Sequence, residues 1–151
     1  MHVDCIEVLH CKFMQKSTMT ASIIYQGDLR CSATHLQSGT VIETDAPTDN
    51  RGKGEKFSPT DTLCVALATC AITTMALRSR DMNIELKDTR IEVLKHMLKD
   101  PRRVGQIDVV IHFPQLQLDE EQRSILESAG NNCPVAKSLH PDLKLNIEYR
   151  W

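Results

Sequence analysis

Residues 57–80 read FSPTDTLCVALATCAITTMALRSR, and this stretch decides the fold. Ser58 and Pro59 suit the N-cap and the first position of a helix, and Asp61 places an acid in the first turn. The residues that follow are apolar nearly all round a helical wheel, so we predict a buried helix that ends near Arg80. Small side chains would let another helix approach closely, which makes this face a candidate subunit interface: Ala66, Ala68, Ala71 and Ala76.

The chain before this helix has the pattern of antiparallel strands. Residues 21–45 are rich in β-branched residues and contain two Gly-bearing turn signals, at 26–28 and 37–39, which predicts a meander. Residues 45–57 carry Pro, Asp, Asn and Gly and are expected to form a loop. Because residues 1–18 lack this periodicity, we predict an N-terminal extension of unknown role over 1–18 and a single domain over 19–151.

The segment after the helix is ambiguous at first. Residues 84–98 fit both a strand and a helix, but Asp100-Pro101 forms a turn signal and 107–113 has the pattern of a strand. A long hairpin is therefore the favoured interpretation.

The C-terminal third predicts two helices and a strand. Asp119 caps a helix that closes near Gly130, Cys133-Pro134 starts a short helix, and residues 143–151 alternate as a final strand. Strands and helices in this order indicate the α+β class and not a doubly wound parallel sheet.

Composition excludes several kinds of partner. The formal net charge of −2 gives no basic field for nucleic acid or acidic membranes. The most apolar run, 63–77, includes three threonines and is shorter than the roughly 20 residues of a membrane span. The N-terminus lacks the pattern of a signal peptide, so we expect a cytoplasmic protein whose six cysteines are reduced.

Two cysteines stand out by position. Cys133 precedes a proline that begins a helix, where backbone N–H groups and the helix dipole favour thiolate, although a buried structural cysteine fits equally well. Cys70 lies in the middle of an apolar helix, where a cysteine is usually structural. Cys64 is roughly 120° away on the same helix and cannot pair with Cys70.

Other chemistry finds little support in the sequence. Cys5, His10 and Cys11 give at most a weak metal-binding hypothesis, and no zinc, phosphate-loop or dinucleotide motif is present. From the residues alone, the chain is an α+β domain with one notable Cys-Pro helix start.

The motifs resemble those of the OsmC/Ohr superfamily. Ser58-Pro59-Thr60-Asp61 followed by Ala68-Thr69-Cys70 is similar to the central helix of that family, and Cys133-Pro134-Val135 is similar to its second cysteine element. The resemblance extends over residues 20–151.

The resemblance implies a fold and an activity. The fold is antiparallel sheets wrapped around a central buried Ala-rich helix, in an intertwined homodimer with two active sites at the interface. The activity is reduction of organic hydroperoxides in the oxidative stress response. Cys70 becomes a sulfenic acid, Cys133 condenses with it to a disulfide, and an external dithiol, for which a dihydrolipoyl group is the candidate, restores both thiols. No resident cofactor or metal is implied.

The sequence departs from the family pattern at the activating residues. The family's glutamate, ten residues before the reactive cysteine, corresponds to Thr60, and Asp61 is the nearest acid. Asp61 also fits a capping box with Ser58, and it lies about 13.5 Å along the helix from Cys70, so it could act only from the partner subunit. Arg51 resembles the activating arginine of the OsmC branch, and Arg30 lies nearer the position of the Ohr branch.

Two other functions remain open. The missing glutamate favours a non-catalytic OsmC-like protein that binds a small apolar ligand at the dimer interface. A cysteine hydrolase or redox sensor is the third alternative. A hydrolase would need a histidine base near Cys70, and the spacing assigns none; His140 is the one histidine close to either cysteine motif.

Overall fold

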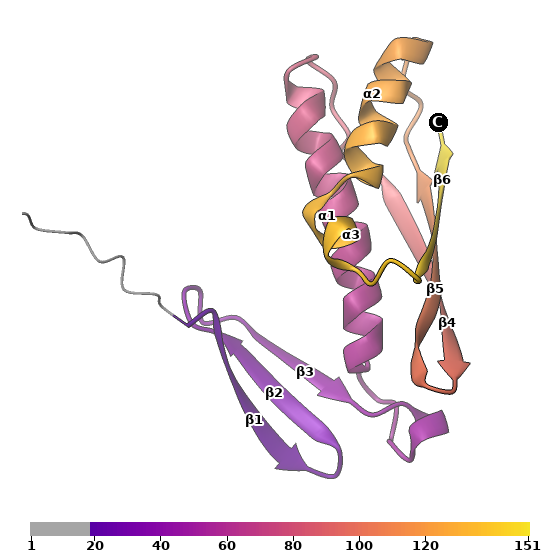
Figure 1. Cartoon of the computed structure of the whole chain (residues 1–151). Helices are drawn as coiled ribbons and strands as arrows, with labels where there is room; N and C mark the ends of the chain where they lie inside the picture. The colour runs from indigo at the N-terminus through magenta and orange to yellow at the C-terminus, as the bar shows by residue number, and fades with distance from the viewer. Residues whose placement is uncertain (1–18) are drawn as a thin grey trace, which may run out of the picture.

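The computed structural model describes residues 19–151, which form two three-stranded sheets and three helices (Figure 1). In chain order the elements are β1 (Ala21–Gly27), β2 (Arg30–His35), β3 (Val41–Asp45), the 3-10 turn η1 (Thr48–Asn50), α1 (Pro59–Arg80), β4 (Arg90–Lys99), β5 (Arg102–His112), α2 (Glu120–Asn131), α3 (Pro134–Ser138) and β6 (Lys144–Arg150). The predicted α+β class is confirmed.

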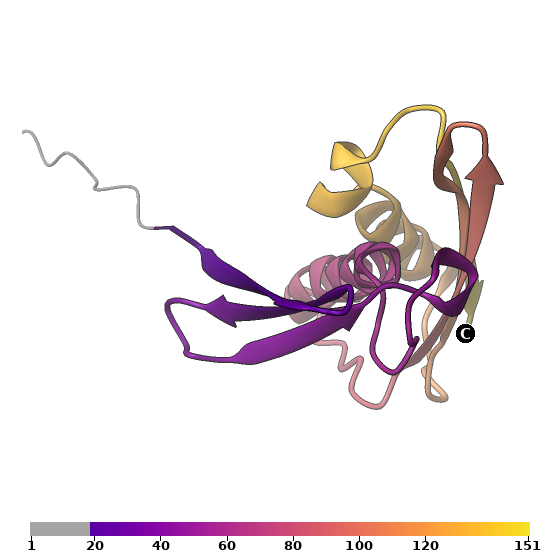
Figure 2. The ribbon, with the colours of Figure 1, turned by 90° about the horizontal axis from the view of Figure 1, so that it is seen from below.

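The first sheet is the predicted antiparallel meander, in the order β1-β2-β3. It extends away from the helices and the second sheet (Figures 1 and 2). More than half of the surface of several large apolar side chains on it is exposed: Ile23, Ile24, Tyr25, Val41 and Ile42. Because successive strand residues point to opposite faces, these side chains leave both faces of the sheet partly apolar and exposed, as is common where a protein interacts with a partner.

The second sheet has the order β4-β5-β6 and is mixed. β4 and β5 form the predicted antiparallel hairpin, but β6 runs parallel to β5, which corrects the expectation of purely antiparallel sheets. A parallel neighbour requires a crossover, and α2 and α3 supply it. β4 begins at Arg90 and not near Ile84, because Asn83 and Asp88 adopt positive φ angles that interrupt an extended backbone.

Helix α1 begins and ends where the sequence predicts. Ser58 is its N-cap, and the side chains of Ser58 and Asp61 bond each other's backbone N–H groups in a complete capping box. One side of α1 packs against α2, α3 and the second sheet and carries most of the buried residues of the helix, Cys64, Leu67, Ala68, Ala71 and Met75. By length and composition alone α1 could cross a membrane, but core helices of globular domains meet the same criterion.

The opposite side of α1 is exposed in the single chain, so the prediction of a helix buried all round is wrong for one copy. This side presents Val65, Ala66, Thr69, Thr73 and Leu77. The Thr69 hydroxyl donates to the carbonyl oxygen of Val65 at 2.8 Å, so the polar atom is satisfied within the helix. The exposed side is therefore apolar in character although threonines form part of it.

The capping box makes a testable contribution to stability. Ser58 is buried, and its Oγ accepts hydrogen bonds from the Asp61 backbone N–H at 3.1 Å and from Lys95 Nζ at 3.3 Å. Ser58→Ala is expected to lower the free energy of unfolding by about 1 kcal/mol, as measured by urea denaturation followed by circular dichroism. Ser124→Ala, at an exposed position inside α2, is the control and should change little. Equal urea midpoints for Ser58→Ala and wild type would contradict this role.

Candidate active site

Two cysteine thiols from distant parts of the chain meet beside the middle of α1. Cys70 lies on α1 and is half-buried, and Cys133 lies at the start of α3 and is fully buried. The two side chains are close enough for a hydrogen bond between them to affect the protonation of Cys133. This contact joins two residues that the sequence motifs had singled out separately.

The position of Cys133 is as predicted, but its protonation is not. Cys133 is the N-cap of α3, with Pro134 at the first helical position, and the Ala136 N–H points at its sulfur at 3.5 Å. Burial raises the pKa of Cys133, and the hydrogen bond with Cys70 raises it further, against the opposing effect of the Ala136 N–H. The expectation that the helix start favours thiolate at Cys133 is therefore wrong, because burial and the neighbouring Cys70 outweigh the backbone N–H groups of Val135 and Ala136.

Asp61 lies in the first turn of α1, away from the thiol pair of its own chain. Its Oδ2 accepts the Ser58 N–H at 2.8 Å, and its Oδ1 lies 2.6 Å from Lys95 Nζ. Burial alone would raise the pKa of Asp61, but the hydrogen bonds from Lys95 and Ser58 outweigh burial and lower it. The alternative interpretation of Asp61 as a capping residue is thus confirmed.

Lys95 is a residue that the sequence prediction overlooked. Its ammonium group donates to Thr60 Oγ1 at 2.8 Å as well as to Ser58 and Asp61, so three acceptors in one helical turn use its three N–H groups. Its side chain is 17% exposed. The available signal was a charged residue at a position where the alternation of β4 predicts an inward side chain.

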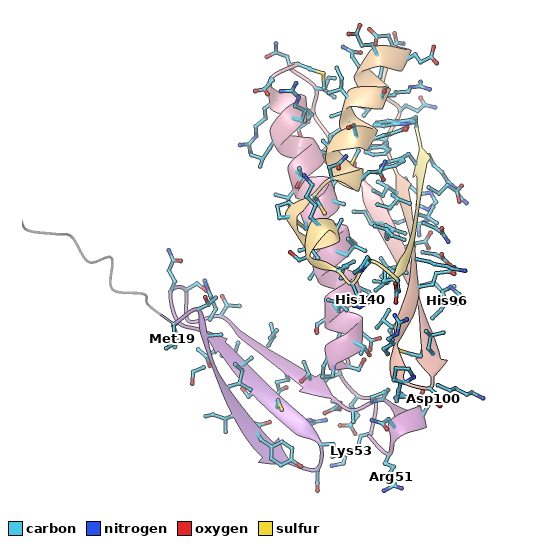
Figure 3. The ribbon with its side chains drawn as sticks, viewed as in Figure 1. Met19, Arg51, Lys53, His96, Asp100 and His140 are labelled. Carbon is cyan, nitrogen blue, oxygen red and sulfur yellow. The ribbon has the colours of Figure 1, made fainter. Side chains whose placement is uncertain are left out.

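The two candidate arginines differ in what they contact. Arg30 on β2 binds both oxygens of the buried Asp45, at 2.6 and 2.8 Å, and Glu55 at 2.6 Å. Arg51 follows η1, is exposed, and points away from the helices (Figure 3). Neither arginine is among the groups that shift the pKa of Cys133, and within residues 19–151 Arg51 forms no ion pair. The single chain therefore brings together the two cysteines but not the activating residues.

An apolar cavity of about 330 Å³ lies between the first sheet and the start of α1. Tyr25, Leu29 and Cys31 line it from the first sheet, and Pro59 and Thr60 line it from α1. Thr60 thus lines this cavity, and its hydroxyl group already accepts a hydrogen bond from Lys95 at 2.8 Å. The cavity could hold a small apolar molecule.

The remaining sequence candidates give no second site. His140 lies after α3, and its Nδ1 accepts the Asp142 N–H at 3.2 Å. In the part of the chain that the structure describes, no group of His, Cys, Asp and Glu side chains is arranged to hold a metal. The weak metal hypothesis for Cys5, His10 and Cys11 falls outside the described residues.

The fold and the site define the chain as an α+β protein with two neighbouring thiols on separate helices. Comparison with known proteins identifies its family. The model of the OsmC-like protein family matches residues 52–148, which is well over half of the chain. The chain belongs to the OsmC-like family.

Relatives agree with this assignment. A structure from Psychrobacter arcticus 273-4, provisionally described as an osmotic stress induced and detoxification response protein, is 47% identical with a TM-score of 0.85, covering 89% of this chain and 98% of that one. The uncharacterized protein YmaD of Bacillus subtilis (strain 168) is 23% identical, over 75% of this chain and 81% of YmaD. The organic hydroperoxide resistance protein OhrB of Bacillus subtilis shares the fold, with a TM-score of 0.62, 20% identity and coverage of 87% and 98%.

The Asp61–Lys95 pair predicts a pH dependence of stability. Because the pKa of Asp61 is lowered in the folded chain, its ionised form stabilises the fold above the unfolded pKa of about 3.9, and this contribution is lost as pH falls through the folded pKa. The destabilisation by Asp61→Asn should therefore be largest near pH 7 and shrink below about pH 4, in urea titrations.

The double variant provides the control. In a Lys95→Met background the effect of Asp61→Asn at pH 7 should be markedly smaller, because the partner charge is gone. A difference between Asp61→Asn and wild type that stays constant from pH 7 to pH 3 would exclude this contribution.

Proposed function

We propose that the protein is a cysteine-based peroxidase that reduces organic hydroperoxides, with Cys70 as the nucleophile and Cys133 as the resolving thiol. The position of Cys70 beside Cys133, near enough to raise the pKa of Cys133, carries the proposal. Membership of a family that includes a protein named for organic hydroperoxide resistance supports it.

The difference between the thiols assigns their roles. Cys70 is half-buried and can be reached by a substrate, whereas Cys133 is fully buried and its raised pKa keeps it protonated at neutral pH. A peroxidatic cysteine must react as thiolate at an accessible position, and a resolving cysteine needs only to lie within bonding reach. Cys70 therefore attacks first.

The reaction uses one hydroperoxide and two thiols. The Cys70 thiolate attacks the outer oxygen of the hydroperoxide, the O–O bond breaks, and the alkoxide leaves as alcohol after taking a proton. Cys70 is then a sulfenic acid, and Cys133 displaces its oxygen as water to form the Cys70–Cys133 disulfide. An external dithiol, for which a dihydrolipoyl group is the candidate, reduces this disulfide by two exchange steps in a reducing cytoplasm.

The proposed active form is an intertwined homodimer. The exposed apolar side of α1 and the exposed first sheet are the two surfaces that a second copy would cover. Among residues 19–151 no ion pair or hydrogen bond places a cation beside Cys70, so in this proposal the partner subunit supplies one. Arg51 is the candidate for this role, since it forms no ion pair within residues 19–151, whereas Arg30 is neutralised by two carboxylates.

A second candidate function is binding of a small apolar ligand without catalysis. The 330 Å³ cavity with Thr60 in place of an acid favours it. A binding protein has no need of two adjacent thiols, so the contact between Cys70 and Cys133 favours the peroxidase.

Thiol counting separates these two functions. Reduced wild-type protein titrated with cumene hydroperoxide should lose two thiols per chain, with a Cys70–Cys133 disulfide identified by peptide mass spectrometry. Cys70→Ser should abolish this loss. Cys133→Ser should instead accumulate a sulfenic acid at Cys70 that a dimedone probe traps. Cys31→Ser is the control, and it should retain the loss of two thiols.

Unchanged thiols at stoichiometric peroxide would contradict the peroxidase proposal. If cumene hydroperoxide or its alcohol then bound to the protein in a calorimeter without oxidation, the ligand-binding function would stand in its place.

A charge introduced on the exposed side of α1 should disrupt the dimer and so tests it. Wild type should sediment at twice the chain mass of 17.1 kDa, and Leu77→Glu should sediment near 17.1 kDa with at least tenfold lower peroxidase activity. Gln117→Glu adds the same charge at another exposed position and should leave the dimer intact. Wild type at 17.1 kDa at micromolar concentration would exclude the dimer.

A further inference from the structure

The C-terminal strand places the hydroxyl of Tyr149 next to the end of α2, just before the proposed resolving cysteine, Cys133. Tyr149, near the end of β6, has its hydroxyl 3.2 Å from the carbonyl oxygen of Glu127 and 3.0 Å from Oδ1 of Asn131. Both acceptors belong to the last turns of α2, and Cys133 follows α2 after one intervening residue. The Tyr149 side chain, from the second sheet, thus holds the end of α2 that precedes Cys133.

An aromatic stack fixes the Tyr149 ring. Trp151 lies nearly parallel to Tyr149, with ring centroids 6.4 Å apart, and its other neighbour is Phe113, at 3.9 Å. Trp151 also donates its indole N–H to Glu127 Oε1 at 2.7 Å. Three of the six aromatic residues of the chain therefore gather at the end of the sheet that holds α2.

Gly130 shows how tightly this helix end is held. A Cβ atom at Gly130 would lie 2.8 Å from the Tyr149 hydroxyl and 3.0 Å from the sulfur of Met75 on α1. The carbonyl oxygen of Gly130 accepts the backbone N–H of Cys133 at 3.3 Å. The Tyr149 hydroxyl therefore lies close to Gly130, and Gly130 in turn bonds the backbone of Cys133.

The Tyr149 hydroxyl keeps its proton throughout. Burial raises the pKa of Tyr149, and the nearby negative charge of Glu127 raises it further. It therefore acts as a hydrogen-bond donor and not as an acid or base in the reaction.

We propose that Tyr149 is a positioning residue for disulfide formation: its hydroxyl holds the end of α2 so that Cys133 stays beside Cys70. This inference rests on the proposed function and adds a residue that neither motif contains. The hydroxyl has no part in the attack on peroxide, because its two hydrogen-bond acceptors are both on α2. Its removal should affect the second chemical step and spare the first.

Tyr149→Phe tests the proposal, since it removes the hydroxyl and retains the stacked ring. The first measurement is the equilibrium of the Cys70–Cys133 disulfide with glutathione, in which two protein thiols and oxidised glutathione give the protein disulfide and two reduced glutathione molecules. The effective concentration of the two thiols should fall about threefold to tenfold, as expected from loss of one buried hydrogen bond. This measurement needs no peroxide, so it remains informative if the peroxidase proposal fails.

The second measurement follows the reaction with cumene hydroperoxide. The rate of the first thiol oxidation should match wild type, while disulfide closure slows and more Cys70 is oxidised to sulfinic acid at excess peroxide. Thr89→Val is the control: it removes a hydroxyl that bonds the Leu86 carbonyl at 2.6 Å, in the loop before β4. It should change neither the glutathione equilibrium nor the ratio of disulfide to sulfinic acid.

A second variant protects the test against a folding defect. Asn131→Ala removes one of the two acceptors, so it should shift the glutathione equilibrium in the same direction by a smaller factor. Its effect should also shrink in the Tyr149→Phe background. An effective concentration equal to wild type in both single variants would overturn the proposal.

Discussion

Helix α1 carries apolar side chains on more than one side, and the chain itself can cover only one of them. The second sheet, α2 and α3 bury Leu67, Ala71 and Met75, while Val65, Thr69 and Leu77 face outward. Burying an apolar side chain is worth about 1.5–3 kcal/mol, so a long helix with an uncovered apolar side favours association. The first sheet has the same uncovered character. Both features are the surfaces that the proposed dimer would cover.

The position of Cys70 follows from this two-sided helix. Cys70 lies at the border between the covered and the uncovered side, so it is half-buried, next to the protein interior on one side and open on the other. Cys133 approaches from the covered side, because α2 packs on α1 and then turns into α3. The buried thiol is the one whose pKa is raised, and the border thiol is the one a substrate can reach. In the proposed reaction, the position of each thiol relative to α1 would therefore separate the two chemical roles.

Features set by residues close together in the chain could be predicted from the sequence. Features set by contacts between distant residues could not. Ser58, Pro59 and Asp61 specify the start of α1 through backbone hydrogen bonds a few residues apart, which a sequence displays directly. The parallel register of β6 on β5 depends on how α2 crosses the sheet, and no short pattern encodes it. The two cysteines were identified through their motifs, but their contact depends on the packing of α2 against α1. Lys95 was missed because its acceptors lie more than 30 residues away.

The corner formed by Thr60, Asp61 and Lys95 bears on how the thiol would be activated. A glutamate in place of Thr60 would add a negative charge at this corner, but Thr60 is neutral and its hydroxyl contacts Lys95. The one carboxylate present, Asp61, is already paired with the same ammonium group. This turn therefore offers no unpaired carboxylate to an activating arginine, whichever chain supplies it, and in the proposed dimer the thiolate would be the anion available to that arginine. Replacement of the glutamate by threonine would then change the partner of the activating cation without removing the need for one.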